Sequence, residues 1–110
     1  MNSLPTKPLS EKTELEQARY FIKKFDAIPD RNWTTDNYQN GDAYCSMGHC
    51  GESNNGRSEE SRLFANLFFG GPNVININDG DSKEYQQATP KARILAALKD
   101  KEKELIKAES

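Results

Sequence analysis

The first third of the chain carries apolar residues at three- and four-residue steps, in the order Leu15, Ala18, Ile22 and Phe25. This spacing predicts an amphipathic helix with one buried side. Ser10 is a suitable N-cap for a helix that begins at Glu11. Thr13 and Glu16 offer an alternative capping box for the same helix. Pro29 ends it, because the residue before a proline is pushed out of helical space.

Two later segments are rich in residues that favour strands. Asn32–Thr35 contains a tryptophan and two threonines, and the Asn40-Gly41 pair after it is a strong hairpin turn, since both residues tolerate positive φ. We therefore expect a short hairpin or extended loop here, with Trp33 anchored in the core. Asn73–Ile77 lies between a proline and an Asn-Asp-Gly turn. It is the clearest strand that the sequence predicts.

Three further helices are expected after the first. Ala43–Cys50 has the length of a short helix. Ser58 caps the next one, and Gly70-Gly71-Pro72 stops it. Thr89-Pro90 starts the last helix, with the proline at the position where its missing N–H is not needed. The buried faces of these last two helices are expected to be Leu63, Phe64, Leu67 and Phe68, and then Ile94, Leu95 and Leu98.

Together these elements predict an α+β fold. Three to four helices would pack on a small two- or three-stranded sheet, with Val74–Ile77 as its central strand. Residues 1–10 are predicted to be a flexible N-terminal tail, since Pro5 and Pro8 block regular structure there. Residues 11–100 are predicted to form a single domain, and residues 101–110 a solvated helical extension.

Composition and charge narrow the class of protein. The chain has 110 residues, which suits one domain. Its net charge of −2 gives no field that would draw it onto nucleic acid or an anionic membrane, so neither is expected as a partner. It shows no secretory signal and no apolar run of the roughly 18 residues that a transmembrane helix needs. We therefore expect a cytoplasmic protein whose thiols stay reduced.

The densest cluster of reactive side chains is Cys45, His49 and Cys50, and His49 is the one histidine. A zinc site wants four ligands, usually Cys or His, so Asp42 or Glu52 would have to complete it. A thiol enzyme would use Cys45 as nucleophile and His49 as base, although such pairs usually come from separate segments. A structural role is favoured, in which the small thiols let a short helix pack closely. No cofactor is expected.

Polar residues after the predicted strand form a second candidate site. Asn78 and Asp79 belong to an Asn-Asp-Gly turn whose spacing does not match a calcium-binding EF-hand loop. Such side chains usually bond the backbone of their own turn, yet the end of a strand is also where open sheets place ligands. Together with Trp33 and Tyr44, they are the residues that we expect to line a pocket for a small ligand such as a nucleotide.

Several short motifs follow one another along the chain, namely Asn32-Trp33, Gly41-Asp42, Cys45, Gly48-His49, Ile77-Asn78-Asp79, Thr89-Pro90-Lys91 and the closing Ile94, Leu95 and Leu98. In this order they resemble a group of small uncharacterised phage and bacterial proteins, a domain of unknown function. That group shows a Trp, a Cys-x-x-Gly-His/small segment, an Ile-Asn-Asp turn and a closing helix. The resemblance spans Phe21 to Asp100, and it implies a shared fold with no catalytic activity.

These observations favour a non-enzymatic intracellular binding module with a protein partner, in keeping with a phage or prophage protein that modulates a host factor. One alternative is a small thiol- or metal-dependent enzyme that uses Cys45 and His49. Another is a protein that sequesters a small ligand such as a nucleotide. The exposed edges of so small a sheet also allow a homodimer.

Overall fold

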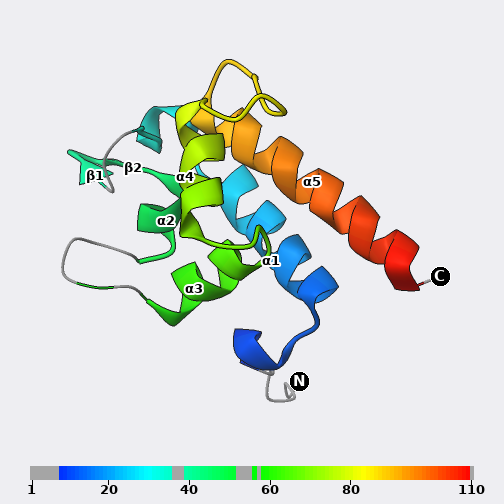
Figure 1. Ribbon diagram of the computed structural model, residues 1–110. Coiled ribbons are helices and arrows are strands. Elements are labelled where there is room, and N and C mark those ends of the chain that lie inside the picture. The colour runs from blue at the N-terminus through cyan, green and yellow to red at the C-terminus, as the bar shows by residue number, and fades with distance from the viewer. Residues whose placement is uncertain (1–7, 36–38, 52–55, 57, 110) are drawn as a thin grey trace.

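The computed structural model describes residues 8–35, 39–51, 56 and 58–109. The helices and strands within these residues follow one another along the chain as labelled in Figure 1. They are the 3-10 helix η1 (Leu9–Glu11), α1 (Glu14–Asp26), the 3-10 helix η2 (Asp30–Asn32), β1 (Gln39–Asn40), β2 (Ala43–Tyr44), α2 (Ser46–His49), α3 (Glu59–Asn66), α4 (Gly71–Asp79) and α5 (Pro90–Glu109).

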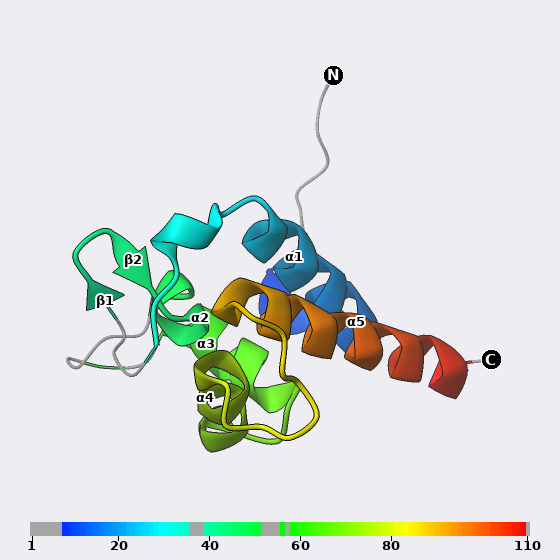
Figure 2. The same cartoon turned by 90° about the horizontal axis from the view of Figure 1, so that it is seen from above.

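The helices pack mainly on one another. The longest helix, α5, runs beside α1, and both views show the two side by side (Figures 1 and 2). Helix α4 also packs against α5, while α2 and α3 contact α4. The core lies among these helices, and its largest fully buried apolar side chains are Phe21, Phe25, Met47, Phe64, Val74, Ile94 and Leu98.

Helix α1 confirms the amphipathic helix that the sequence predicts, but it starts at the alternative cap. Thr13 is the N-cap: its Oγ1 accepts a hydrogen bond from Glu16 N at 3.1 Å, and Glu16 Oε1 accepts one from Thr13 N at 2.9 Å. This reciprocal pair satisfies two N–H groups that the first turn leaves unpaired. The residues before it form η1, so residues 9 and 10 of the expected tail are helical, and Leu9 packs against the core.

The predicted strand Asn73–Ile77 is wrong, because these residues lie inside helix α4. Its buried positions are Gly71, Val74, Ile77 and Asn78, and their three- and four-residue spacing is that of a helix. Pro72 sits in the first turn, where a proline is tolerated, and Gly80 ends the helix with a φ of 85°. The β-branched residues favour a strand locally, but the caps and the buried face favour a helix.

The fold is mixed α+β, as predicted, and its sheet is at the small end of the predicted size. The sheet lies at the periphery, and the expectation that Val74–Ile77 is its central strand is wrong. Within the described residues, the sheet has two antiparallel strands, β1 and β2. The pair Asn40↔Ala43 encloses a two-residue turn at Gly41-Asp42, one position later than expected. Trp33 is 7% exposed, as its predicted core position requires, and it forms an isolated parallel bridge with Tyr44.

Helix α5 confirms the predicted start at Thr89-Pro90. Thr89 Oγ1 accepts a hydrogen bond from Ala92 N at 3.1 Å. The helix then continues without a break through residues 101–109. In this last part Leu105 packs partly against the core, and Glu102 accepts a 2.8 Å hydrogen bond from Arg19 of α1.

Candidate functional site

The rings of Trp33 and Tyr44 contact the ring of His49, with centroid separations of 4.9 Å and 5.3 Å. Trp33 follows η2, Tyr44 ends β2, and His49 ends α2. His49 Nε2 donates a hydrogen bond to Asn32 O at 2.8 Å. Burial lowers the pKa of His49, because the low-polarity surroundings disfavour the charged imidazolium. The structure therefore brings three predicted site residues together, and their rings pack on one another.

Cys45 and Cys50 flank α2 as its N-cap and C-cap, and no disulfide joins them. The Cys45 sulfur accepts a hydrogen bond from Gly48 N–H at 3.4 Å, and both cysteines are buried in the core. Among the residues that the structure describes, no group of three or more His, Cys, Asp or Glu side chains is arranged to hold a metal ion. Burial beside Met47 suits a packing role, and the catalytic and metal-ligating roles stay predictions.

Asn78, predicted to line a ligand pocket, is 1% exposed. Its Oδ1 accepts a hydrogen bond from Ser46 N at 3.0 Å. Its Nδ2 donates to Thr34 O at 3.0 Å and to Asp79 Oδ1 at 2.9 Å. The side chain thus ties α4 to the start of α2 and to the segment after Trp33. Both ends of the amide are engaged inside the protein.

Arg93 of α5 extends this buried polar network. Its Nη2 donates to Asn78 O at 2.7 Å, and its Nε donates to Ile77 O at 3.1 Å. Its Nη1 donates to Gln87 O at 2.8 Å in the loop before α5. The guanidinium thereby satisfies carbonyl groups at the C-terminal end of α4, where a positive charge is favoured.

A surface groove of about 360 Å³ lies where α4, the loop 80–89 and α5 meet, beside the end of α3. The site residues predicted from the sequence are not among those that line it. The lining residues are Phe68, Phe69, Asn73, Asn76, Ile77, Ser82, Glu84, Tyr85, Ala97, Asp100, Lys101 and Glu104. The volume is within the range of small-molecule sites and suits a few side chains of a partner.

Phe69 is the most exposed large apolar side chain of the described residues, at 87%. Its φ is 65°, in the left-handed region that glycine or asparagine adopts more easily. The backbone around it is held by Gly70 N, which donates to Ala65 O at 2.9 Å, and by Asn73 Nδ2, which donates to Phe68 O at 2.8 Å. The chain therefore holds an aromatic ring in solvent at the edge of the groove.

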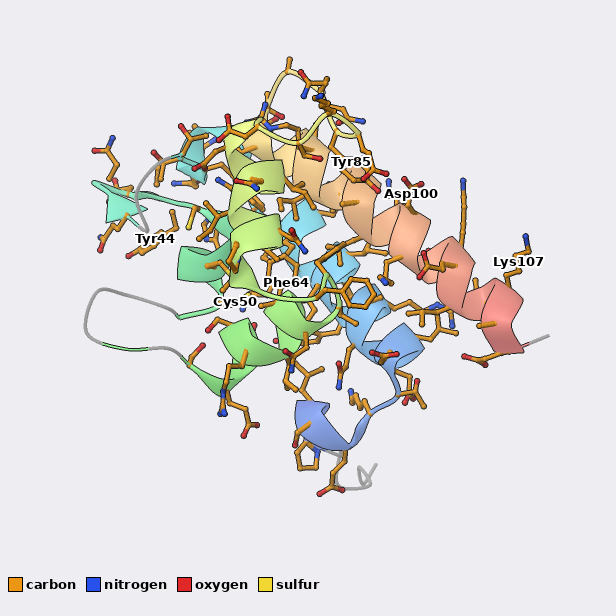
Figure 3. All side chains as sticks on the ribbon, in the orientation of Figure 1. Tyr44, Cys50, Phe64, Tyr85, Asp100 and Lys107 are labelled. Atoms are coloured by element: carbon orange, nitrogen blue, oxygen red, sulfur yellow. The ribbon has the colours of Figure 1, made fainter. Side chains whose placement is uncertain are left out.

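Charged and polar side chains of α5 and the preceding loop form the rest of the groove wall. Lys101 Nζ lies 4.9 Å from the Phe69 ring centroid and 3.1 Å from Glu104 Oε1. Tyr85 and Asp100 lie beside each other in Figure 3, and the Tyr85 hydroxyl donates to Asp100 Oδ2 at 3.0 Å. Burial, together with this hydrogen bond to a carboxylate, raises the pKa of Tyr85 to about 12.

The groove is not predicted from the sequence, because its residues come from separate segments of the chain. One signal was nevertheless present. Phe69 falls outside the stripe that Phe64, Leu67 and Phe68 share, and it directly precedes Gly70. An apolar ring that is off the buried stripe, at the end of a helix, indicates a surface residue.

No family model matches this chain, and neither a curated protein nor a solved structure is significantly similar to it. In the part of the chain that the structure describes, none of the helices combines the length and the apolar character needed to cross a membrane.

Proposed function

We propose that this chain is a non-enzymatic protein-binding module, and that it binds its partner through the groove between α4 and α5 with Phe69 at the edge. The observation that carries the proposal is the exposed Phe69 ring on a backbone with a φ of 65°. Folding gains little from a ring in solvent, and the left-handed conformation costs about 1 kcal/mol for a residue with a Cβ. The left-handed backbone itself serves the end of α3, where Gly70 N bonds to Ala65 O and Phe69 N to Asn66 O, but glycine or asparagine would serve there without an exposed ring. The aromatic side chain is explained by a use outside the fold.

The groove offers what a partner's side chain needs beside this ring. Its floor includes Phe68, Ile77 and Ala97, which are largely buried but form part of the lining. Covering the Phe69 ring in a complex would contribute on the order of 2 kcal/mol from apolar burial. Aromatic anchors of this kind carry much of the binding energy in protein interfaces.

The cluster of Trp33, Tyr44 and His49 supports binding less well. Trp33 is already buried, and the rings contact each other. The amide of Asn78 is engaged by the backbone of Ser46 and Thr34. We therefore assign the partner to the groove. We propose a host protein as that partner, in keeping with the sequence expectation of a phage or prophage protein.

Substitution of Phe69 tests the proposal. Phe69→Asn removes the ring but keeps a residue that tolerates positive φ, so the fold should remain at least as stable. The matched control is Ile106→Ala, since Ile106 is also exposed on the surface but lies outside the groove. Each protein would be purified from the cells that naturally express it and weighed by native mass spectrometry.

We expect the mass spectra of the wild type and of Ile106→Ala to show a bound protein partner, and the spectrum of Phe69→Asn to show none. Affinity for the purified partner should fall at least about tenfold in Phe69→Asn, as for an interface anchor. A partner retained unchanged by folded Phe69→Asn would refute the groove as the docking surface. A wild-type mass raised only by a metal ion or a small ligand would instead support one of the other functions.

A further inference from the structure

The wall of the groove is predominantly acidic. Three carboxylates, those of Glu84, Asp100 and Glu104, line the groove together with one ammonium group, that of Lys101. Lys101 is paired with Glu104, which leaves the other two carboxylates without a cation from the groove itself. Tyr85 donates to Asp100, but a neutral hydroxyl does not cancel the negative charge. The groove therefore complements a positively charged ligand.

The protein's own lysine shows how a cation binds here. Lys101 Nζ lies over the Phe69 ring, 4.9 Å from its centroid, and contacts Glu104 Oε1 at 3.1 Å. The Lys101 side chain is only 12% exposed, so its aliphatic stem is covered while its ammonium reaches both groups. An aromatic face beside a carboxylate is a favourable site for an ammonium or a guanidinium.

An apolar floor lies under these charges. Ile77 and Ala97 are 6% and 1% exposed, and Phe68 is 9% exposed. The amides of Asn73 and Asn76 stand on the exposed side of α4 and line the same groove. The Asn73 Nδ2 is bonded to Phe68 O, so the Asn76 amide is the better placed of the two to hydrogen-bond the backbone of a bound segment. A ligand that fits this floor and this wall carries aliphatic and cationic side chains together.

We infer that the groove binds a segment of the partner protein in which a lysine or arginine is flanked by aliphatic side chains. This inference rests on the proposed function and specifies the chemistry of the partner. The partner's cation takes the place of the Lys101 ammonium on the Phe69 ring and beside Glu104. Lys101 is then an internal competitor, which holds the site until a partner displaces it.

A peptide selection tests the inference without a known partner. A displayed library of random short peptides would be selected on the full chain, and peptides that also bind Phe69→Asn would be removed. We expect the remaining peptides to be enriched in Lys or Arg next to Leu, Ile or Val. Neutral or acidic groove-dependent peptides would overturn the inference and leave the proposed function standing. The absence of any peptide that depends on Phe69 would overturn both.

Charge substitutions then test the competition. Lys101→Met keeps the apolar stem and removes the ammonium, so the selected peptides should bind roughly twofold to fivefold more tightly in a fluorescence anisotropy titration. Asp100→Asn and Glu104→Gln should each weaken binding by a similar factor. The matched controls are Lys103→Met and Glu109→Gln, which change exposed charges of α5 outside the groove.

The controls should leave the dissociation constant unchanged. If Lys101→Met weakened binding of the basic peptides as much as Glu104→Gln does, Lys101 would be a ligand-binding residue and not a competitor. If Lys103→Met tightened binding as much as Lys101→Met, and Glu109→Gln weakened it as much as Asp100→Asn and Glu104→Gln, general charge would explain the binding, and the site-specific inference would fail.

Discussion

Phe69 and Asn78 lie in surroundings opposite to those their side chains prefer. The apolar ring of Phe69 is 87% exposed, and the polar amide of Asn78 is 1% exposed. Asn78 is explained within the fold, because its hydrogen bonds to Ser46 N and Thr34 O join three segments. The left-handed backbone of Phe69 also belongs to the fold, because it lets Gly70 N bond to Ala65 O and Phe69 N to Asn66 O at the end of α3. The exposed ring has no comparable explanation within the fold. Its contact with Lys101 is a surface cation–π interaction worth about 0.5–1 kcal/mol.

The role assigned to Asn78 predicts a large loss of stability in Asn78→Ala. The substitution leaves a buried N–H of Ser46 and a carbonyl of Thr34 without their partner, and it opens a small cavity. We expect the free energy of unfolding in urea to fall by about 2–4 kcal/mol. Asn76→Ala, on the exposed side of the same helix, is the control and should change it by less than about 0.5 kcal/mol. Equal effects of the two substitutions would contradict a structural role for Asn78.

At the scale of single elements, helices α1, α3 and α5 could be predicted because caps and apolar spacing agree. Ser58, for example, caps α3 through a 3.0 Å hydrogen bond from Ser61 N to its Oγ. The sequence misplaced α4, since Val74, Ile75 and Ile77 favour strands when they are considered alone. Tertiary burial of one face overrides that preference, and burial of this kind cannot be read from a short window of sequence.

A short helix was expected over Ala43–Cys50, but α2 covers only Ser46–His49, and Ala43 and Tyr44 instead form β2 of the hairpin. Their arrangement was not predicted, because it depends on contacts between distant segments. His49 contacts both Trp33 and Tyr44, and Ser46 is bonded by Asn78. The residues expected at a ligand site thus do gather in space. Asn78 is buried among them and does not line a pocket, because it points inward from helix α4 and does not lie at the end of a strand.

At the scale of the whole molecule, the groove is the feature that is hardest to predict from the sequence. Its wall combines the end of α3, one side of α4, the loop 80–89 and the middle of α5. Residues such as Asn73 and Asp100 come together only because α4 packs against α5. The size and charge of the chain lead to the expectation of a binding module, which stays a prediction. The one local signal for the proposed surface is Phe69, which falls outside the buried stripe of Phe64, Leu67 and Phe68.

The buried environment of His49 predicts how the stability of the whole molecule depends on pH. Burial lowers the pKa of His49 in the folded protein below the ordinary histidine value of about 6.5. The stability that neutral His49 gives the folded protein is therefore fully present above about pH 6.5. It is lost as the pH falls through the folded-state pKa, because the unfolded chain binds the proton more readily. We expect the free energy of unfolding to decrease as the pH is lowered from 7 to about 5.

His49→Gln is the matched variant for this prediction. The glutamine amide can still donate a hydrogen bond toward Asn32 O but does not titrate. As the pH falls, the free energy of unfolding should decrease more steeply for the wild type than for His49→Gln. Any advantage of the wild type at pH 7 should therefore shrink or become a disadvantage. A difference that stays constant between pH 7 and 5 would show that His49 does not contribute to the pH dependence.

The measurement that most directly tests the proposed docking surface is cross-linking in the cells that naturally express the protein. A photoreactive benzoylphenylalanine would replace Phe69, and in a separate variant it would replace Ile106 as the control outside the groove. We predict a discrete adduct with one partner protein from position 69 after irradiation, and none of that size from position 106. The same adduct from both positions, or no adduct from position 69 in a folded protein, would contradict a partner bound at the groove.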